Sequence, residues 1–502
     1  MTTKTNVTTE AAATAETDAA PALDIPIVIR GRVIEPGDDA LEFGGRAGAR
    51  FRQADPRKYA GDLVLRDPGD LRDLQATPID EIIDFLAELG PRLDIDKNPL
   101  MQTAFRLALD AGEMTAPVLR PVYEQFPAMF HRDRLSGQVD RMVGKAYLDG
   151  WVEQGRPGTS TIRIRAVGTR HLHIIAGNVP VTAGLTVIRA ALTKADCLIK
   201  TPSNDPFTAP AILRTMVELD PDHPVTKHFA VAYWKGGDEE IERQVIRPSR
   251  IEKLTAWGGM ASMTHIQKYL VPGIELIAMN PKLSISIVGH EALEDTAAMR
   301  QAALGVALMA GRMNQTACSS TRVVYVECDD GEEDLERLEA FGTAVHQAFL
   351  ALPPHESTAP KRPDPDLEDE MRALALDDEF YRVIGDTASA GVVVSRTADE
   401  PVEFADRLAN RVVNLVPVPD ISRVPRWVSE ETQTVGIYPE ALRERLRDDL
   451  ALHGVQRTLP LGTSFHQQSQ ADREQTFGMP HDGTEPMRRM VRWVIDQSAE
   501  AV

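Results

Sequence analysis

The chain of 502 residues contains only three cysteines, and their spacing is not that of metal ligands. So few thiols argue against a disulfide framework and indicate a reducing compartment, so we expect a cytoplasmic protein. The chain also lacks an uncharged apolar run of the ~18 residues that a membrane helix needs, and its start lacks the basic and apolar regions of a secretory signal. We therefore expect no membrane span.

Positive charge is scarce as well, because 55 Lys and Arg stand against 75 Asp and Glu, for a formal charge of -20. Broad nucleic-acid binding needs a basic footprint, so we expect no nucleic-acid partner. A GxGxxG fingerprint is missing too, which argues against an ordinary Rossmann site. With 43% hydrophobic residues, the composition is that of a globular protein with about two to four domains.

Strand and helix patterns alternate from residue 171 onward. The expected elements are 171–176, 183–192, 196–200, 209–218, 229–234, 239–246, 253–257 and 260–270. Apolar strands separated by helices indicate parallel pairing with crossover connections, which predicts a doubly wound dinucleotide-binding domain. A second α/β region is expected from residue 281, with a strand at 283–288, a helix at 293–311 and a strand at 323–327.

Composition and patterning also suggest the domain boundaries. We predict a disordered tail, a helical lead-in with the nucleotide-binding domain, a catalytic domain, and a C-terminal segment that packs on the cofactor domain or at a subunit interface: 1–24, 25–280, 281–455 and 456–502. Residues 353–368 are predicted to be a surface excursion, and 486–497 an amphipathic helix. Residues 159–167 alternate at period two, which is typical of a half-exposed strand that can pair between subunits in a homo-oligomer.

One cysteine has the surroundings of a nucleophile. Cys318 follows a long apolar stretch and lies among Gln315, Ser319 and Ser320, whose polar groups can favour a thiolate. The alternative for any free cysteine is packing as a small hydrophobe, which we predict for Cys197 at an inward strand position. Cys328 is followed by two aspartates whose charge disfavours a thiolate. Cys318 is therefore the candidate nucleophile.

Four short motifs follow one another in a set order: Gly177-Asn178-Val179-Pro180, residues 198–206, Ala256-Trp257-Gly258-Gly259 and Asn314-Gln315-Thr316-Ala317-Cys318. Together, over residues 171–327, they resemble the acyl-CoA reductase branch of the aldehyde dehydrogenase superfamily, most closely the LuxC-type fatty acid reductases of bacterial bioluminescence. The resemblance implies an α/β, aldehyde dehydrogenase-like fold, with a doubly wound cofactor domain and a second α/β domain that carries the nucleophilic cysteine. The implied activity is reduction of an acyl-CoA or other acyl thioester to the aldehyde, and the acyl group is expected to be a fatty acyl group.

The same resemblance implies catalytic roles and no metal. Cys318 would form the acyl-enzyme, while the Asn178 amide and the backbone N–H of Cys318 would hold the oxyanion. Glu275 takes the position of the water-activating Glu when Pro281 is aligned with the family's Glu-Leu-Gly-Gly-Lys-Ser-Pro segment, although the Gly-Gly-Lys is replaced. A reductase must not hydrolyse its intermediate, so a weakened base suits reduction. Asp482-Gly483 also resembles this branch, with an open role.

Further positions are implied to bind the cofactor. Lys200 lies where the family places a lysine on the adenosine ribose, and Ser203 lies where NAD-preferring enzymes often carry a Glu. Because Ser can donate to a 2′-phosphate that Glu would repel, we expect NADPH, with NADH as the alternative. The remaining expected cofactor residues, which suit a pyrophosphate or line its crevice, are Gly236, Gly237, Trp257, Gly258 and Gly259.

Two other functions are compatible with these residues. One is an NAD(P)-dependent aldehyde dehydrogenase working in the oxidative direction, which needs an intact water-activating Glu. The other is a non-catalytic subunit whose Cys318 accepts an acyl group from an activating enzyme. Since LuxC-type reductases work beside an acyl-activating enzyme, the resemblance also implies such a protein partner.

Overall fold

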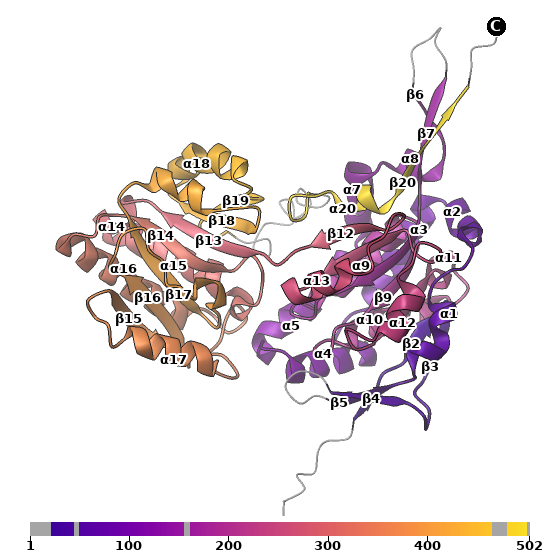
Figure 1. Cartoon of the computed structure of the whole chain (residues 1–502), viewed down its shortest axis with the longest axis horizontal. Coiled ribbons are helices and arrows are strands. Elements are labelled where there is room, and N and C mark those ends of the chain that lie inside the picture. The colour runs from indigo at the N-terminus through magenta and orange to yellow at the C-terminus, as the bar shows by residue number, and fades with distance from the viewer. Residues whose placement is uncertain (1–21, 45–49, 155–160, 464–478, 499–502) are drawn as a thin grey trace, which may run out of the picture.

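The computed structural model describes residues 22–44, 50–154, 161–463 and 479–498. Two seven-stranded sheets form the centres of two α/β domains, and two three-stranded sheets lie beside the first domain (Figure 1). Among the described residues, no helix combines the length and the apolar character needed to cross a lipid bilayer.

The first domain has the strand order β12-β11-β8-β9-β10-β2-β3. Its strands are β2 (Ile27–Ile29), β3 (Arg32–Ile34), β8 (Arg170–Ile174), β9 (Asp196–Lys200), β10 (Phe229–Ala232), β11 (Lys253–Trp257) and β12 (Glu275–Met279). The strands from β12 to β10 pair in parallel. Crossover helices connect them: α9 (Val181–Leu192), α10 (Thr208–Leu219), α12 (Glu239–Val245) and α13 (Met260–Gln267). This order confirms the predicted doubly wound fold, because parallel neighbours need such crossovers.

A helical region lies in the chain between β3 and β8 and shares the largest apolar core with α9 and α10. Its longer helices are α3 (Ile79–Arg92), α4 (Pro99–Ala111), α5 (Ala116–Glu124) and α7 (Arg132–Met142). The shorter elements are η2 (Pro56–Tyr59), α1 (Ala60–Leu63), η3 (Pro68–Leu71), α2 (Arg72–Ala76), α6 (Phe126–Met129), α8 (Lys145–Asp149) and, before β10, α11 (Pro224–Lys227). A small sheet, β1-β5-β4, joins β1 (Leu23–Asp24), β5 (Arg50–Gln53) and β4 (Leu41–Gly44).

The second domain has the strand order β15-β16-β17-β14-β13-β18-β19. Its strands are β13 (Leu283–Val288), β14 (Thr321–Glu327), β15 (Tyr381–Asp386), β16 (Ala390–Ser395), β17 (Val412–Val418), β18 (Thr432–Tyr438) and β19 (Arg457–Pro460). Its helices are α14 (Glu291–Glu294), α15 (Thr296–Gly311), η4 (Arg312–Gln315), α16 (Glu332–Ala351), α17 (Pro365–Leu374), η5 (Ala405–Arg407), η6 (Ile421–Trp427) and α18 (Glu440–Leu452). The single helix predicted at 293–311 is divided, because Asp295 caps the start of α15.

The fourth sheet, β20-β7-β6, projects from the first domain as an arm (Figure 1). It consists of β6 (Val152–Gln154), β7 (Ile162–Val167) and β20 (Arg492–Gln497). The predicted helix at 486–497 is therefore wrong: only α20 (Pro486–Met490) is helical, and β20 pairs antiparallel with β7. Trp493, Val494 and Ile495 favour strands, and the partner strand overrides the helical pattern.

Three other predicted segments differ in detail. Of the tail predicted at 1–24, residues 1–21 lie outside the described residues, whereas Leu23 and Asp24 form β1. The surface excursion at 353–368 includes the start of α17, which Asp364 caps, and its Lys361 donates to the Gly112 carbonyl at 3.0 Å. In the C-terminal segment, β19 belongs to the sheet of the second domain, whereas α20 packs on α9.

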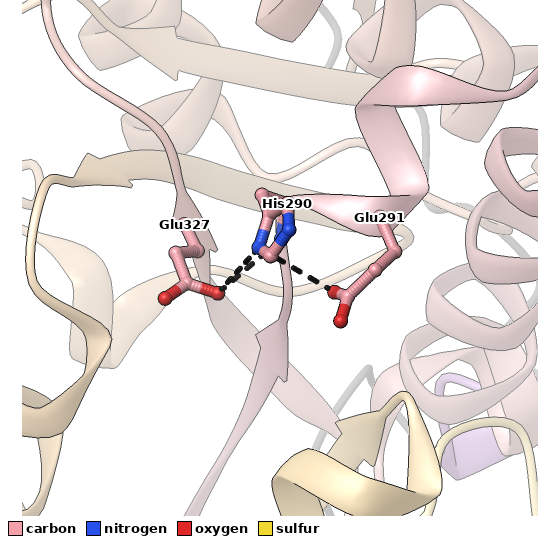
Figure 2. A group of neighbouring side chains, drawn as sticks. All are labelled: His290, Glu291 and Glu327. Carbon is pink, nitrogen blue, oxygen red and sulfur yellow. Dashed lines mark hydrogen bonds and ion pairs between the residues drawn. The ribbon is translucent and has the colours of Figure 1, made fainter.

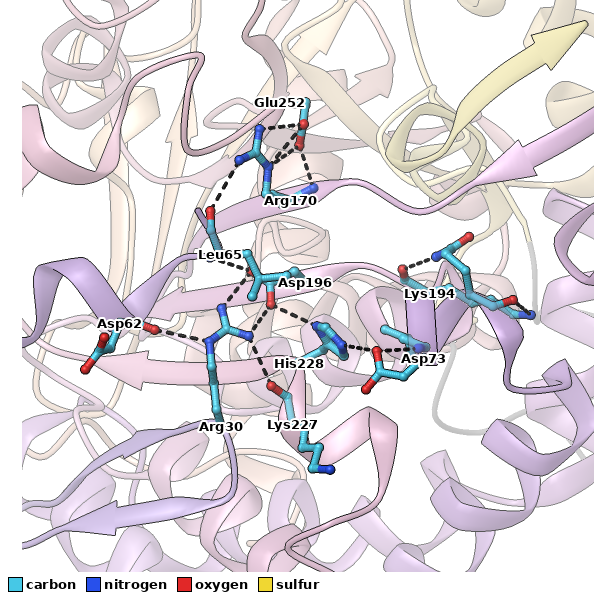
Figure 3. Close-up of polar contacts among 12 residues, drawn as sticks. Arg30, Asp62, Leu65, Asp73, Arg170, Lys194, Asp196, Lys227, His228 and Glu252 are labelled. Carbon is cyan, nitrogen blue, oxygen red and sulfur yellow. Dashed lines mark hydrogen bonds and ion pairs between the residues drawn. The ribbon is translucent and has the colours of Figure 1, made fainter. Parts of the chain in front are cut away.

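A buried ionic network holds the β2–β3 hairpin on the first sheet (Figure 3). The Asp196 carboxylate accepts from the Arg30 guanidinium at 2.6 and 3.0 Å, contacts His228 Nδ1 at 3.2 Å and accepts the Leu65 N–H at 3.3 Å. His228 Nε2 contacts Asp73 at 2.8 Å on its other side. Burial opposes ionisation of Asp196, but His228 and Arg30 outweigh it and lower the pKa of the carboxyl. The carboxylate therefore fastens three chain segments to the start of β9.

Candidate active site

The loop that carries Cys318 lies between α15 and β14 and has an unusual backbone. Met313, Asn314 and Gln315 adopt left-handed conformations with φ of 54°, 52° and 62°. The buried Gln315 side chain holds this shape: its amide N–H groups donate to the Thr321 and Val412 carbonyls at 2.9 and 2.8 Å, and its oxygen accepts the Val412 N–H at 3.0 Å. Gln315 thus supports the loop. Its amide bonds to Thr321 and Val412, so it does not favour the thiolate by direct contact, which is the role that the sequence had suggested.

Cys318 itself is solvent-exposed and lies in the loop three residues before β14. The Gln433 amide donates to its sulfur at 3.0 Å, and the Ser284 hydroxyl donates to its carbonyl at 2.8 Å. Desolvation and the charge of Asp482 raise the pKa of the thiol, whereas Gln433, its own backbone N–H and Arg457 oppose the rise. The sulfur is therefore accessible yet enclosed closely enough to lose part of its hydration.

Asn178 reaches the same loop from the first domain, in the segment that follows β8. Its side-chain amide donates to the Thr316 carbonyl at 3.0 Å, two positions before Cys318. Gly177 is required beside it, because a Cβ there would lie 2.1 Å from the Asn204 side-chain oxygen. The structure thus brings Asn178 of the first domain to the loop that carries Cys318, and the bond to Thr316 uses only one of the two amide hydrogens of Asn178.

A turn at residues 481–484 completes the surroundings of the thiol. Asp482 accepts from the Gln433 amide at 2.6 Å, and Arg189 of α9 donates to His481 Nδ1 at 2.8 Å. The His481 ring also meets Trp257 edge to face, with centroids 5.1 Å apart. Burial, Arg189 and Arg457 lower the pKa of His481 to about 3, so the ring is neutral. The sequence had marked Asp482-Gly483, but it gave no signal for Gln433 or Arg189.

The predicted cofactor residues lie at the carboxyl ends of the first sheet's strands. No heavy atom lies within 4 Å of a Cβ built on Gly236, Gly237 or Gly259, so all three border open space. Gly259 is the N-cap of α13, and Gly258 stands between it and Trp257, the last residue of β11. Backbone N–H groups at such a helix start can face a pyrophosphate.

Lys200 ends β9 beside this space. Its ammonium lies 5.6 and 5.5 Å from the ring centroids of Tyr233 and Trp234, and desolvation lowers its pKa to about 8 in spite of the charge of Glu242. Ser203 follows in the loop after β9 and is half-buried. A desolvated cation, a hydroxyl and exposed backbone glycines form a donor set that fits an anionic dinucleotide.

Comparison with known proteins then decides the family. The family model for acyl-CoA reductase (LuxC) matches residues 74–493. The chain belongs to this family. A long-chain acyl-protein thioester reductase from Aliivibrio fischeri is 32% identical over 69% of this chain and 67% of its own length, and one from Vibrio harveyi is 25% identical over 94% and 92%. The predicted membership of an oxidoreductase family is thereby confirmed.

Solved structures confirm the fold of this LuxC-family chain. The NADP-dependent glyceraldehyde-3-phosphate dehydrogenase of Bacillus halodurans C-125 superposes with a TM-score of 0.68 at 13% identity, over 95% of this chain and 100% of that one. An oxidoreductase from Marinobacter aquaeolei gives 0.71 at 14% identity, over 97% and 100%. The aldehyde dehydrogenase-like fold predicted from the sequence is correct.

The structure does not bring Glu275 to the thiol. Glu275 begins β12 and pairs with Lys253 at the start of β11, whereas Trp257, a predicted cofactor residue, ends β11. Four strand positions, roughly 13 Å at ~3.3 Å each, separate the two ends. The carboxylate is bound by the Lys253 ammonium and by Arg489 Nε, the latter at 3.0 Å. Both of its oxygens are thus engaged away from Cys318.

The other two cysteines of this LuxC-family protein are poorly suited to attack. Cys197 is buried in the core of the first domain. Cys328 is partly buried, and desolvation with the nearby charges of Asp334, Asp329 and Asp330 raises its pKa to about 12.

One group of possible metal ligands occurs among the described residues: His290, Glu291 and Glu327 (Figure 2). It lies at the carboxyl ends of β13 and β14, whereas Cys318 precedes the amino end of β14. His290 Nδ1 contacts Glu327 at 3.2 Å and Glu291 at 3.7 Å, and these contacts raise the pKa of the imidazole despite some desolvation. The imidazolium can therefore pair with both carboxylates and offset one of their two negative charges.

Proposed function

We propose that this chain reduces an acyl thioester to the free aldehyde with NADPH, through an acyl-enzyme on Cys318. The observation that carries this proposal is the contact of Asn178, from the first domain, with the loop that carries Cys318, where the Asn178 amide lies 3.0 Å from the Thr316 carbonyl. Family membership supports the same chemistry.

In the proposed reaction the Cys318 thiolate attacks the thioester carbonyl. A new carbon–sulfur bond forms, and the substrate's bond to its own sulfur breaks, so that the departing thiolate takes up the proton that Cys318 lost. Asn178 and the Cys318 N–H stabilise the oxyanion during this exchange. A nicotinamide coenzyme held by Lys200 and the start of α13 would supply a hydride to the acyl carbon. Cys318 then leaves as a thiolate when the carbonyl reforms, and the aldehyde is released.

The coenzyme preference is proposed from three residues. Lys200 and the α13 N-terminus at Gly259 offer positive charge and backbone donors, and Ser203 offers a hydroxyl in place of a carboxylate. We expect Ser203→Glu to weaken NADPH binding more than NADH binding, and Ser203→Gln serves as the uncharged control of the same size. An equal loss of affinity for NADPH and NADH in the Ser203→Glu variant would contradict the proposed position of the 2′-phosphate.

The position of Glu275 favours reduction over aldehyde oxidation. Oxidation needs a base beside the acyl-enzyme to activate water, and the Glu275 carboxylate is instead bound by Lys253 and Arg489. We therefore expect Glu275→Gln to retain thioester reduction. If the unsubstituted chain oxidises aldehydes and the Glu275→Gln variant does not, the oxidative assignment would be supported instead.

The acyl donor and the assembly are proposed on other grounds. The relatives named above are called long-chain acyl-protein thioester reductases, so we propose a long acyl group delivered on CoA or on an acyl-activating partner enzyme. We also propose a homo-oligomer that pairs through the arm, where Ile495 is 67% exposed. Light scattering of the purified chain, with Ile495→Lys as the variant, tests this assembly.

Two variants test the catalytic roles. We expect Cys318→Ala to abolish acyl-CoA-dependent NADPH oxidation while NADPH still binds, with Cys328→Ala as the matched control that remains active. Asn178→Ala should lower kcat about 10²–10³-fold, as for the loss of one oxyanion donor. Normal turnover by Cys318→Ala would end the proposal.

A further inference from the structure

The contact between Gln433 and Cys318 depends on a third residue. The Gln433 side chain is only 4% exposed, and its amide nitrogen lies 3.0 Å from Cys318 Sγ and 2.6 Å from Asp482 Oδ1. An NH₂ group carries two hydrogens, so it can donate to both acceptors at once. Gln433 is the second residue of β18, whereas Asp482 lies in the turn at residues 481–484.

Asp482 decides which end of this amide faces the sulfur. If the amide were reversed, its oxygen would lie at 2.6 Å from a carboxylate oxygen, and two acceptors repel at that distance. The Asp482 side chain is 7% exposed, so water does not relieve such a clash. With the nitrogen held toward Asp482, the second N–H points to the sulfur.

The turn that carries Asp482 is itself fixed by the first domain. Arg189 of α9 donates to His481 at 2.8 Å, and Trp257 packs edge to face on the same ring. The charged groups that act on the sulfur are Asp482 and, from β19, Arg457. The position of Asp482 is therefore set before any substrate arrives.

We propose that Gln433 is a catalytic residue that donates a hydrogen bond to the Cys318 sulfur, and that Asp482 is the positioning residue that keeps the Gln433 amide in the donating orientation. This proposal rests on Cys318 being the nucleophile of the proposed function. The pair neither gives nor takes a proton. It stabilises the sulfur each time that it is a thiolate: before attack on the thioester, and again when the aldehyde departs.

The charge of Asp482 and its acceptor oxygen act in opposite directions. Its negative charge raises the pKa of the Cys318 thiol, whereas the Gln433 hydrogen bond that it orients lowers that pKa. Asp482 has a positive φ of 49°, a conformation that Asn and Gly tolerate. Asp482→Asn removes the charge and keeps an acceptor oxygen, while Asp482→Gly removes both, so comparing these two variants isolates the orienting effect.

The experiment is the pH dependence of iodoacetamide alkylation of the full chain, without coenzyme or acyl substrate. The rate of the Cys318→Ala protein is subtracted as the background from Cys328 and Cys197. Gln433→Met keeps the side-chain length without the donor and should slow alkylation near neutral pH about tenfold, the factor that one hydrogen bond to a charged group is worth. Its profile should move to higher pH.

The orienting role predicts a specific pattern among the variants. Asp482→Asn should be alkylated severalfold faster than Asp482→Gly when Gln433 is present, and at the same rate as Asp482→Gly in the Gln433→Met protein. Asp449→Asn, on the exposed face of α18, controls for loss of one negative charge. Thermal unfolding identifies any variant that fails to fold.

Equal rates for Asp482→Asn and Asp482→Gly in the presence of Gln433 would overturn the positioning role, and a Gln433→Met profile like that of the unsubstituted protein would overturn the donor role. Because alkylation needs neither thioester nor NADPH, the outcome is separate from that of the reductase assay. A chain that shows this pattern but reduces no thioester would contradict the proposed function alone.

Discussion

Removal of the Asp196 carboxylate should destabilise the first domain more than any change on its surface. In Asp196→Ala, Arg30 loses contacts of 2.6 and 3.0 Å, and the Leu65 N–H loses its acceptor at 3.3 Å. Asp196 is 1% exposed, so little water can replace the carboxylate. His228 also loses its partner inside the sheet.

The expected loss is about 3–5 kcal/mol of unfolding free energy, because breaking a buried ion pair leaves its partner without compensation. Asp62→Ala is the matched control, since the Asp62 carboxylate pairs with Arg32 at 3.8 Å and both side chains are more than half exposed. That pair should contribute no more than about 0.5 kcal/mol. Asp62 still offers Arg30 its backbone carbonyl in the control.

Denaturant unfolding followed by circular dichroism and tryptophan fluorescence measures both variants. The pKa of Asp196 is lowered in the folded chain, so its contribution is fully present above the unfolded pKa of about 3.9 and is lost as the pH falls through the folded pKa. The difference between Asp196→Ala and the unsubstituted chain should therefore be constant near neutral pH and shrink in acid. A loss no greater than that of Asp62→Ala would refute the assigned role of the network.

Three further outcomes are expected. Gly177→Ala should cost about 1–3 kcal/mol and lower kcat, because its Cβ meets Asn204 at 2.1 Å; an unchanged melting temperature and kcat would contradict this. Gln315→Ala should cost about 2–4 kcal/mol through three lost hydrogen bonds and also slow alkylation of Cys318, whereas unaltered alkylation would show that the loop keeps its shape without it. The imidazole of His290 should titrate by NMR with a pKa above the usual value of about 6.5. Its contribution to the unfolding free energy should be complete below about pH 6.5 and should disappear as the pH rises through the folded pKa. A pKa at or below about 6.5 would contradict the ion pairs.

Much of the fold was predictable because its elements have strong local patterns. The strands 196–200, 253–257 and 283–288 were predicted with the boundaries that the structure has. Each is an apolar run buried by helices, so local sequence and burial agree. At residues 486–497 the local helical pattern disagrees with the structure. There β20 pairs with β7, a segment more than 300 positions away, and no local pattern reveals such a pairing.

The site was predictable in the same uneven way. Cys318 and Asn178 belong to recognisable motifs, and the structure brings their segments together. Gln433 has no motif of its own, because its role depends on strand β18 lying beside β13 and on a turn from the C-terminal segment. Glu275 was placed by alignment to a single proline. The sheet register shows it at the amino end of β12, whereas the strand end that lies beside Trp257 is the carboxyl end, at Met279.

The most direct test of acyl-thioester reduction is to follow nicotinamide absorbance while the purified chain meets NADPH and a series of acyl-CoA thioesters of increasing length, with Cys318→Ala and Cys328→Ala in parallel. We expect loss of NADPH with an equal amount of aldehyde formed, retained in Cys328→Ala and absent in Cys318→Ala. No loss of NADPH with any thioester, together with formation of NAD(P)H when an aldehyde is added, would contradict the reductive assignment and identify an oxidative dehydrogenase.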